Sequence, residues 1–412
     1  MGFIDPEIGA PHSAATLPMP PSALGTLLVG RGFQGGVDGF GDLGAGTSNA
    51  DAGSARDPYG CGVHAPALGG VLKGGNVRVW VDLGNSPHVA LFGEVVDELR
   101  QHGDDVFLTA RDHAQTVGLA LARWSDVVVV GGRSPANLAG KAAAIGGRAH
   151  DLARLLRNER PDAALSHGSY AQALVAARLR IPLVTMMDYE HQPANHLSFR
   201  VARRVIVPNV FPTSALRRFG AKEQKVLRYA GFKEQLYLAR FRPNQEVLAE
   251  LGIDPQKVIV AMRPAPEGAL YHRTANEYFD ELLDKVRRRS DIEAVLLART
   301  PVDARRYAAL RGVIVPRRPI DALSLIASAD LMIGGGGTMT RESALLGTST
   351  YTVFIGRPAA VDAELMRLGL LHDLRTGGRP VFEKRSAPTR PVPEERRREV
   401  LDTIRKALTE VV

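Results

Sequence analysis

The 412-residue chain is long enough for two ordinary domains, because a single hydrophobic core seldom grows beyond about 250–300 residues. Cys61 is the only cysteine, which excludes an internal disulfide and a thiolate metal cluster, and no apolar run reaches the length of a membrane-spanning helix. The net charge is +8, and residues 1–76 carry three basic and six acidic side chains, so the remainder has a surplus of +11. Such a surplus favours anionic partners, among them phosphorylated small molecules.

Residues 1–76 differ from the rest of the chain in composition. They are rich in Gly, Pro, Ala and Ser and show no sustained period of a strand or a helix. A segment of this kind cannot bury enough apolar surface to offset the entropy of ordering it, which predicts a disordered tail. A translation start assigned too far upstream is the alternative, because the folded pattern begins abruptly at Val77.

From Val77 onward, short apolar runs alternate with amphipathic segments, which is typical of βαβ units and a parallel sheet. The predicted strands are 77–83, 106–109, 127–130, 163–166, 183–187 and 205–207, and the predicted helices are 89–102, 138–157, 171–180 and 213–219. The basic residues Lys141, Arg148, Arg154 and Arg157 predict a solvated surface on the second of these helices. We expect these elements to form an N-terminal Rossmann-like lobe over residues 77–235.

The pattern breaks between Tyr229 and Asn244, and a second series follows. Its predicted strands are 258–262, 294–298, 313–315, 331–333 and 350–354, and its predicted helices are 277–289, 303–311, 322–327 and 340–346. We expect a second Rossmann-like lobe over residues 245–390. A final helix, about 393–408 within residues 391–412, would pack back across the junction. The predicted fold class is therefore α/β, with two doubly wound parallel-sheet lobes facing a central cleft.

Ligands of open parallel sheets bind beyond the carboxyl ends of the strands, so the strand-to-helix turns are the places to search. The clearest turn contains Gly335, Gly336 and Gly337, which let a phosphate approach the backbone. The helix that starts near Thr338 offers free N–H groups to the same phosphate. Glu342, about one turn later, could accept hydrogen bonds from a ribose diol. The structural alternative is a tight turn with a glutamate placed favourably against the helix dipole.

The turn after the first strand contains Asn85, Ser86, Pro87 and His88. It combines hydrogen-bonding side chains with an imidazole at the start of a helix. His88 could therefore act as a general base or contact a sugar or a phosphate. The structural alternative is a helix cap, in which Ser86 caps the helix and Pro87 takes the first helical position.

Two arginines end strands of the second lobe. Arg263 closes the strand 258–262, and Arg299 follows the next strand. Both would face the same crevice as the glycine loop if the lobe is doubly wound, and a guanidinium suits a diphosphate. Either arginine could instead be a surface charge.

Polar residues also follow two further strands of the first lobe. His167 and Ser169 come after one strand, and Asp188 and Glu190 come after the next. They bring imidazole, hydroxyl and carboxylate groups to the cleft, where Asp188 or Glu190, like His88, could remove a proton from an acceptor. No His-x-x-x-His or comparable ligand spacing is present, so we expect no metal site.

These residues belong to motifs that resemble a known family. The motifs are, in chain order, WVDLGNSPHV at 80–89, SHGS at 166–169, DYEH at 188–191, GFKE at 231–234, RPAPEGALY at 263–271 and GGGTM at 335–339. Together they resemble domain of unknown function family 354 of archaea and bacteria, which has no agreed activity. The resemblance extends from Val77 to about Asp373.

More distantly, the layout is similar to that of GT-B enzymes, namely the lipid-intermediate N-acetylglucosaminyltransferases and the non-hydrolysing UDP-N-acetylglucosamine 2-epimerases. This likeness implies that Glu342 binds ribose, the glycine loop the diphosphate and Arg263 a phosphate. It also implies that the first lobe is the acceptor side and the second lobe the nucleotide side. The epimerases carry an arginine in the first loop and an aspartate after the glycine of the strand-four loop. This chain has Asn85 with Ser86, and Ser169, at those places, which counts against epimerisation.

The resulting expectation is a nucleotide-sugar-dependent glycosyltransferase in glycan or glycoconjugate biosynthesis, which uses a UDP-linked sugar and an unknown acceptor. It would need neither a metal nor a cofactor. The alternatives are a UDP-sugar 2-epimerase-like enzyme and a non-catalytic nucleotide-binding protein. Sparse aromatic residues and the lack of a recognised module argue against nucleic acid as a partner. We expect a cytoplasmic location, and a lipid-linked acceptor would bring the protein to the inner face of the membrane.

Overall fold

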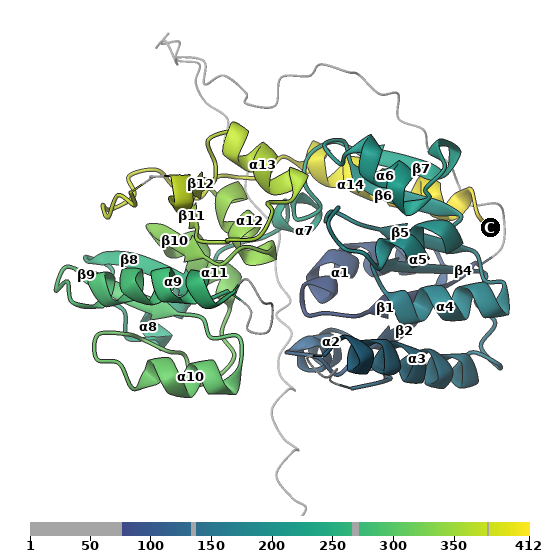
Figure 1. The fold of residues 1–412 in the computed structure, drawn as a ribbon, viewed down its shortest axis with the longest axis horizontal. Coiled ribbons are helices and arrows are strands. Elements are labelled where there is room, and N and C mark those ends of the chain that lie inside the picture. The colour runs from purple at the N-terminus through teal and green to yellow at the C-terminus, as the bar shows by residue number, and fades with distance from the viewer. Residues whose placement is uncertain (1–75, 133–136, 266–271, 377–378) are drawn as a thin grey trace, which may run out of the picture. The chain divides into compact units, whose positions relative to one another are not determined.

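The computed structural model describes residues 76–132, 137–265, 272–376 and 379–412. Residues 1–75 of the predicted tail and residues 266–271 of one motif lie outside the described residues. The described chain forms two sheets with helices packed around them (Figure 1). All strand pairs in both sheets are parallel, which confirms the predicted α/β class with two doubly wound lobes.

The first lobe contains a seven-stranded sheet. Its strands are β1 (Arg78–Leu83), β2 (Asp105–Ala110), β3 (Val128–Val129), β4 (Ala163–His167), β5 (Leu183–Met186), β6 (Arg204–Pro208) and β7 (Val226–Tyr229). Its helices are α1 (Pro87–Gln101), α2 (Thr116–Arg123), α3 (Leu138–Leu155), α4 (Tyr170–Leu179), α5 (Asn195–Val201), α6 (Thr213–Phe219) and α7 (Gln235–Leu238), with a 3₁₀ turn at Glu223–Lys225. The spatial order is β3-β2-β1-β4-β5-β6-β7, so the winding direction reverses between β1 and β4.

The second lobe contains a five-stranded sheet. Its strands are β8 (Val258–Arg263), β9 (Ile292–Leu296), β10 (Leu331–Gly334), β11 (Ser349–Thr352) and β12 (His372–Asp373), in the order β12-β11-β10-β8-β9. Its helices are α8 (Glu246–Glu250), α9 (His272–Arg287), α10 (Pro301–Ala308), α11 (Ala322–Ser328), α12 (Thr338–Leu345) and α13 (Ala360–Arg367), with a 3₁₀ turn at Leu374–Thr376, and the last helix of the chain is α14 (Glu394–Thr409).

The observed elements differ from the predicted ones in two ways. The predicted strand 313–315 is wrong, because Ile314 makes only an isolated bridge to Val295. In addition, several short elements were not predicted, namely β7, β12, α2, α5, α7, α8 and α13. These elements have only two to eight residues, so they show too few turns or alternations for a period to stand out.

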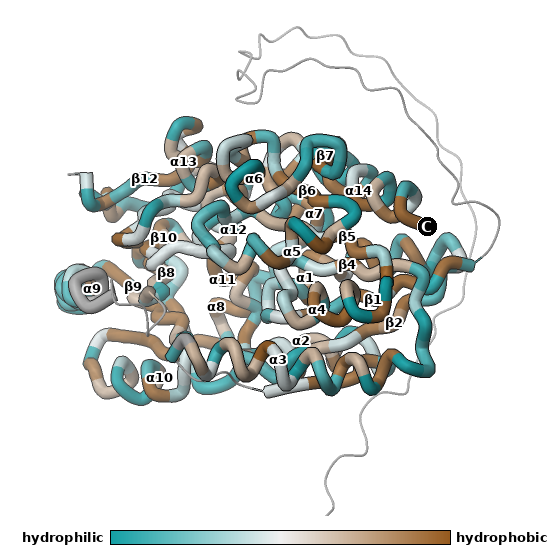
Figure 2. The backbone as a smooth tube through the Cα atoms, turned by 45° about the vertical axis from the view of Figure 1, so that its right-hand side comes forward, coloured by the Kyte–Doolittle hydropathy of each residue, from teal (hydrophilic) through white to brown (hydrophobic). Residues whose placement is uncertain are grey.

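Each sheet has its own hydrophobic core, because its strands are buried on both faces under helices. In the first lobe the core includes Trp80, Leu152 and Phe199, and in the second it includes Phe279 and Ile333. Figure 2 shows hydrophobic and hydrophilic stretches alternating along α3, as expected of a helix that rests one face on a sheet. None of the described helices is long and apolar enough to span a bilayer.

One polar network lies inside the core of the first lobe. Asp82, at the end of β1, is fully buried and pairs with Arg148 of α3 through two oxygens, at 2.6 and 2.8 Å. Ser169 and Thr109 donate to the same carboxylate, at 2.5 and 2.6 Å. Burial raises the pKa of Asp82, but the charge of Arg148 and these hydrogen bonds outweigh it and lower that pKa overall. The prediction that Arg148 lies on a solvated basic surface is therefore wrong.

The chain passes between the two lobes twice. It first leaves β7 through α7 and α8 to enter β8. After residue 379 the chain first stays with the second lobe, where Lys384 pairs with Asp330. It then returns to the first lobe and forms α14. Helix α14 lies beside β6 and β7 (Figure 1) and pairs with α1 through Arg397 and Glu94, at 3.0 Å. The predicted final helix is thus present and packs on the first lobe.

Candidate functional site

A cavity of about 400 Å³ lies where the strand-to-helix turns of both lobes meet. Doubly wound sheets leave such a crevice at the carboxyl ends of their strands, where the winding reverses. In the second lobe this point lies between β8 and β10, and Arg263 there is the register partner of Gly334. The described residues that line the cavity include Asn85, His88, His167, Asp188, Tyr189, Lys233, Arg299, Gly335, Gly336, Gly337, Thr338, Arg341, Phe354, Asp362 and Arg375.

The glycine loop forms one wall of the cavity. Gly336 and Gly337 have φ of +82° and +95°, a region that side chains disfavour. Gly335 has a different reason to be glycine, because an added Cβ would lie 2.4 Å from the Cα of Ala265. Helix α12 begins directly after the loop, at Thr338, so its first N–H groups point toward any anion held there.

If the glycine loop binds a nucleotide, as the sequence predicts, replacing Gly335 by alanine should weaken that binding by about tenfold or more, because the loop must move away from the backbone of Ala265. Gly118 offers a matched control, since it lies in α2 with no atom near the position of an added Cβ. Gly118→Ala should leave binding unchanged and add about 0.5–1 kcal/mol to the free energy of unfolding. Isothermal titration with UDP and urea unfolding would check both variants, and equal UDP affinity in the two would contradict the prediction.

Arg263 and Arg299 lie together beside this loop, although only Arg299 lines the cavity. Arg299 donates to the carbonyls of Pro264 and Gly336, at 2.7 and 3.3 Å. Burial and the neighbouring charge of Arg263 lower the pKa of Arg299 to about 10. Burial also lowers the pKa of Arg263, whose guanidinium donates to the sulfur of Met339 at 3.5 Å. Within the described ranges, neither guanidinium forms a salt bridge with a carboxylate.

His88 lies at the start of α1, where Pro87 takes the first helical position as expected. The backbone N–H of Gly84 donates to Nδ1 of His88 at 3.1 Å, so the proton of the neutral ring is on Nε2. Burial, with smaller contributions from the neighbouring His167 and the charge of Lys233, lowers the pKa of His88 to about 3. The imidazole is therefore neutral near pH 7 and offers the cavity a hydrogen-bond donor.

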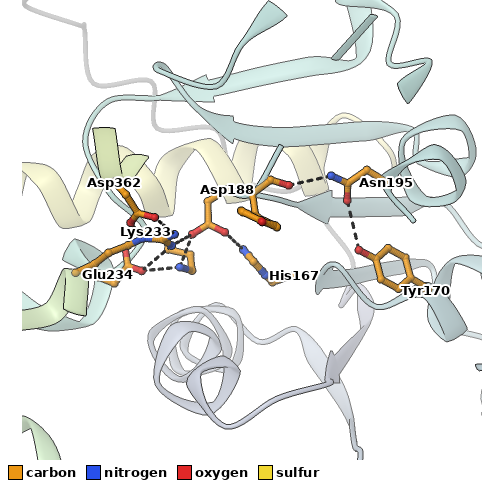
Figure 3. Close-up of polar contacts among 9 residues, drawn as sticks. His167, Tyr170, Asp188, Asn195, Lys233, Glu234 and Asp362 are labelled. Carbon is orange, nitrogen blue, oxygen red and sulfur yellow. Dashed lines mark hydrogen bonds and ion pairs between the residues drawn. The ribbon is translucent and has the colours of Figure 1, made fainter. Parts of the chain in front are cut away.

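Asp188, which follows β5, is the centre of a buried charge cluster (Figure 3). Lys233 and Arg341 both donate to its Oδ2, at 2.5 and 2.6 Å, and Nε2 of His167 lies 3.1 Å from its Oδ1. Arg341 belongs to the second lobe and also pairs with Asp362 of α13 at 2.7 Å, so its bond to Asp188 joins the two lobes. Burial raises the pKa of Asp188, but the charges of Lys233 and Arg341 hold it well below its usual range.

Several cluster residues were not among the predicted site residues. Lys233 and Glu234 form a further ion pair at 2.5 Å. They belong to the GFKE motif at 231–234, which was the signal that could have identified them. Arg341 directly precedes Glu342 in α12, but nothing in the helical pattern distinguishes it from a surface arginine.

Besides Arg263, four predicted residues lie outside the cavity lining. Glu342 accepts from the hydroxyl of Tyr237 at 2.5 Å, and Glu190 accepts from the N–H of Ala360 at 2.8 Å. Both glutamates are buried. Ser169 is the N-cap of α4 and donates to Asp82, and the hydroxyl of Ser86 accepts from the N–H of Gln115 instead of capping α1. Their functional roles stay predictions. No group of three or more His, Cys, Asp or Glu side chains among the described residues could hold a metal ion.

Solved structures with the same architecture share little sequence with this chain. The UDP-GlcNAc 2-epimerase from Neisseria meningitidis, bound to UDP-GlcNAc, has a TM-score of 0.61 at 14% identity and covers 80% of this chain and 100% of its own. The UDP-N-acetylglucosamine 2-epimerase from Rickettsia bellii has a TM-score of 0.57 at 17% identity, with 82% and 97% covered. These similarities establish the GT-B-like fold.

Sequence comparison identifies the family. An uncharacterized protein of Methanocaldococcus jannaschii is 31% identical over 297 residues, which make up 71% of this chain and 86% of that protein. The model of a family described as a protein of unknown function, DUF354, matches residues 77–375. The chain therefore belongs to the DUF354 family.

Proposed function

We propose that this protein is a glycosyltransferase-like enzyme that uses a nucleotide-activated sugar, with a UDP-linked sugar as the donor. The observation that carries the proposal is the pair of half-buried guanidiniums, Arg263 and Arg299, beside the glycine loop. Neither forms a salt bridge with a carboxylate of the described residues, and burial together with the charge of Arg263 lowers the pKa of Arg299 to about 10. The charges of Glu342 and Asp303 raise the pKa of Arg263 and of Arg299, respectively, but do not outweigh these effects. Two adjacent cations that are partly withdrawn from water are costly unless an anion joins them.

A diphosphate has the charge and the shape that this place requires. Its two negative phosphates would offset both guanidiniums, and the N–H groups at the start of α12 would bind the remaining oxygens. As the bond between sugar and diphosphate breaks, negative charge develops on the leaving group. Fixed cations and N–H groups stabilise that charge without needing to reorganise, so the proposed transfer requires no metal.

Transfer is favoured over 2-epimerisation by the state of the carboxylates in the cavity. Epimerisation at a sugar carbon requires a base that removes a proton from carbon, which is a much weaker acid than a hydroxyl group whose oxygen is attacking. The described lining has two carboxylates, Asp188 and Asp362, and Arg341 binds both. The charges of Lys233 and Arg341 hold the pKa of Asp188 well below its usual range, so this carboxylate is a weak base.

The proposal assigns each lobe a part. The second lobe, with the arginine pair and the glycine loop, would bind the nucleotide. The first lobe, with His88, His167 and Asp188, would bind the acceptor. Cys61 cannot form an internal disulfide, which agrees with a cytoplasmic location.

Isothermal titration with UDP, GDP, CDP, ADP and UDP-N-acetylglucosamine would test the proposal. Arg263→Ala and Arg299→Ala should each weaken binding of the preferred nucleotide by roughly 10–100-fold, the size expected for a lost charged hydrogen bond. Arg289→Ala is the matched control, because Arg289 is a surface arginine of the same lobe that pairs with Asp291. The free energy of unfolding of the unliganded Arg299→Ala variant should change little, since relief of the repulsion with Arg263 offsets the loss of the hydrogen bonds to Pro264 and Gly336. Failure of the wild-type protein to bind any of these nucleotides would refute the proposal.

A further inference from the structure

We propose that His167 is the general base that deprotonates the acceptor, that Asp188 is its positioning residue, and that the acceptor is a neutral hydroxyl compound. This inference rests on the proposed glycosyl transfer. It names the class of acceptor. It also gives the role of general base to His167, which the sequence placed in the cleft without a specific role.

The tautomer of His167 follows from its neighbour. Asp188 is ionised, because Lys233 and Arg341 hold its charge, and an ionised carboxylate only accepts hydrogen bonds. Nε2 of His167 must therefore carry the proton that it donates to Oδ1 of Asp188, at 3.1 Å. The other ring nitrogen, Nδ1, has no hydrogen-bond partner among the described residues, and the side chain lines the cavity. In this tautomer Nδ1 is the acceptor nitrogen of the ring, and it is available to take a proton from the ligand.

The contacts of Asp188 hold the His167 ring in that orientation. Its Oδ2 is occupied by Lys233 and Arg341, so Oδ1 is the oxygen left for His167 (Figure 3). Because two cations fix the carboxylate from both lobes, it cannot turn away from the imidazole. The charge of Asp188 also stabilises the imidazolium that forms when His167 accepts a proton.

His88, which the sequence analysis considered as a general base, cannot take this role. Its Nδ1 already accepts from the N–H of Gly84, which leaves only Nε2–H facing other groups. Its ring centroid lies 5.3 Å from that of His167, so the two imidazoles border the same part of the cavity. The structure therefore provides one histidine that donates and one that accepts.

The acceptor class follows from the presence of this base. A hydroxyl group must lose its proton as its oxygen attacks, whereas a carboxylate or phosphate acceptor has no proton to lose. In the proposed step, the acceptor oxygen bonds to the anomeric carbon while the bond from that carbon to the diphosphate oxygen breaks. The hydroxyl proton passes to Nδ1 of His167, and the diphosphate leaves with the electron pair beside Arg299.

The test measures UDP release from UDP-N-acetylglucosamine, with water as the acceptor and with added sodium azide. Water needs a base, but azide is an anion that attacks without losing a proton. His167→Ala should release UDP about 10²–10⁴-fold more slowly than the wild type in water, the usual contribution of a general base. Azide should restore most of that rate, with a glycosyl azide as the product. Asp188→Asn should also slow the reaction in water and respond to azide.

Two controls separate this role from a structural one. His167→Ala should bind UDP as the wild type does, which shows that the site is folded. His196→Ala removes an exposed histidine of α5 and should leave the rate unchanged. An unchanged rate in His167→Ala, or a slow rate that azide does not restore while UDP still binds, would overturn the assignment. A wild-type protein that does not bind UDP-N-acetylglucosamine, or that binds it and releases no UDP even with azide, would instead refute the proposed transfer, and the inference with it.

Discussion

Replacing Arg148 by methionine should lower the free energy of unfolding of the first lobe by about 3–5 kcal/mol. This is the cost of leaving a buried charge without its partner. Asp82 is fully buried, and the hydrogen bonds from Ser169 and Thr109 would not offset the loss of two bonds to a guanidinium. Urea unfolding followed by tryptophan fluorescence would measure the effect in this lobe alone, because both tryptophans of the chain, Trp80 and Trp124, belong to it.

Lys141→Met is the matched control, since Lys141 is an exposed basic residue of the same helix. It should change the free energy of unfolding by less than about 0.5 kcal/mol. The double variant Asp82→Asn with Arg148→Met should be more stable than Arg148→Met, because it removes the charge that was left unpaired. If Arg148→Met and Lys141→Met unfold at the same urea concentration, the pair does not stabilise the lobe.

Glu342→Gln should raise the free energy of unfolding by about 3 kcal/mol at pH 8 and change it little at pH 4.5. Burial raises the pKa of Glu342 to about 7 in the folded protein, against an ordinary value of 4.5. The folded state therefore favours the protonated glutamate, and the resulting stability is complete below pH 4.5. It is lost as the pH rises to 7, at about 1.4 kcal/mol for each pKa unit. Glutamine avoids the loss because it has no charge to bury, and it can still accept from Tyr237.

Thermal unfolding of the two proteins between pH 4.5 and 8 would check this result. Glu364→Gln is a suitable control, because Glu364 lies on the neighbouring helix α13 and has a shift of the opposite sign. Its hydrogen bond with Arg367 lowers the pKa of Glu364. That variant should be slightly less stable than the wild type at pH 8. A constant difference between wild type and Glu342→Gln across the whole pH range would contradict the raised pKa.

The sequence predicted the fold well because its signals are local and repeated. Strands such as β1 and β8 are mostly apolar, and each is followed by a longer amphipathic helix. The turns after these strands could then be located, and parallel strands bring all such turns to one edge. The false strand at 313–315 has the same apolar composition, but only Ile314 reaches a neighbouring strand, and a sequence does not show whether a partner is within reach.

The side-chain partners could not be predicted, because each joins segments far apart in the chain. Arg148 belongs to a helix with other basic residues, and nothing local indicates that it turns inward to Asp82. Glu342 occupies a position suited to a ribose, yet Tyr237 binds its carboxylate. His167 and His88 differ in which ring nitrogen is occupied by a hydrogen-bond partner, and the sequence does not show those partners. The roles of these residues in binding and catalysis stay predictions until the variants are measured.

The two passages of the chain between the lobes have a mechanical consequence. A single linker would let one lobe swing in any direction relative to the other. Here there are two linkers, one through α7 and α8 and one before α14. Together they restrict the relative motion of the lobes to rotation about an axis that passes through both linkers. Helix α14 anchors the second linker on the first lobe, through Arg397 and Glu94. Opening and closing of the cavity would therefore follow one path, which returns Arg341 to the same place beside Asp188 each time.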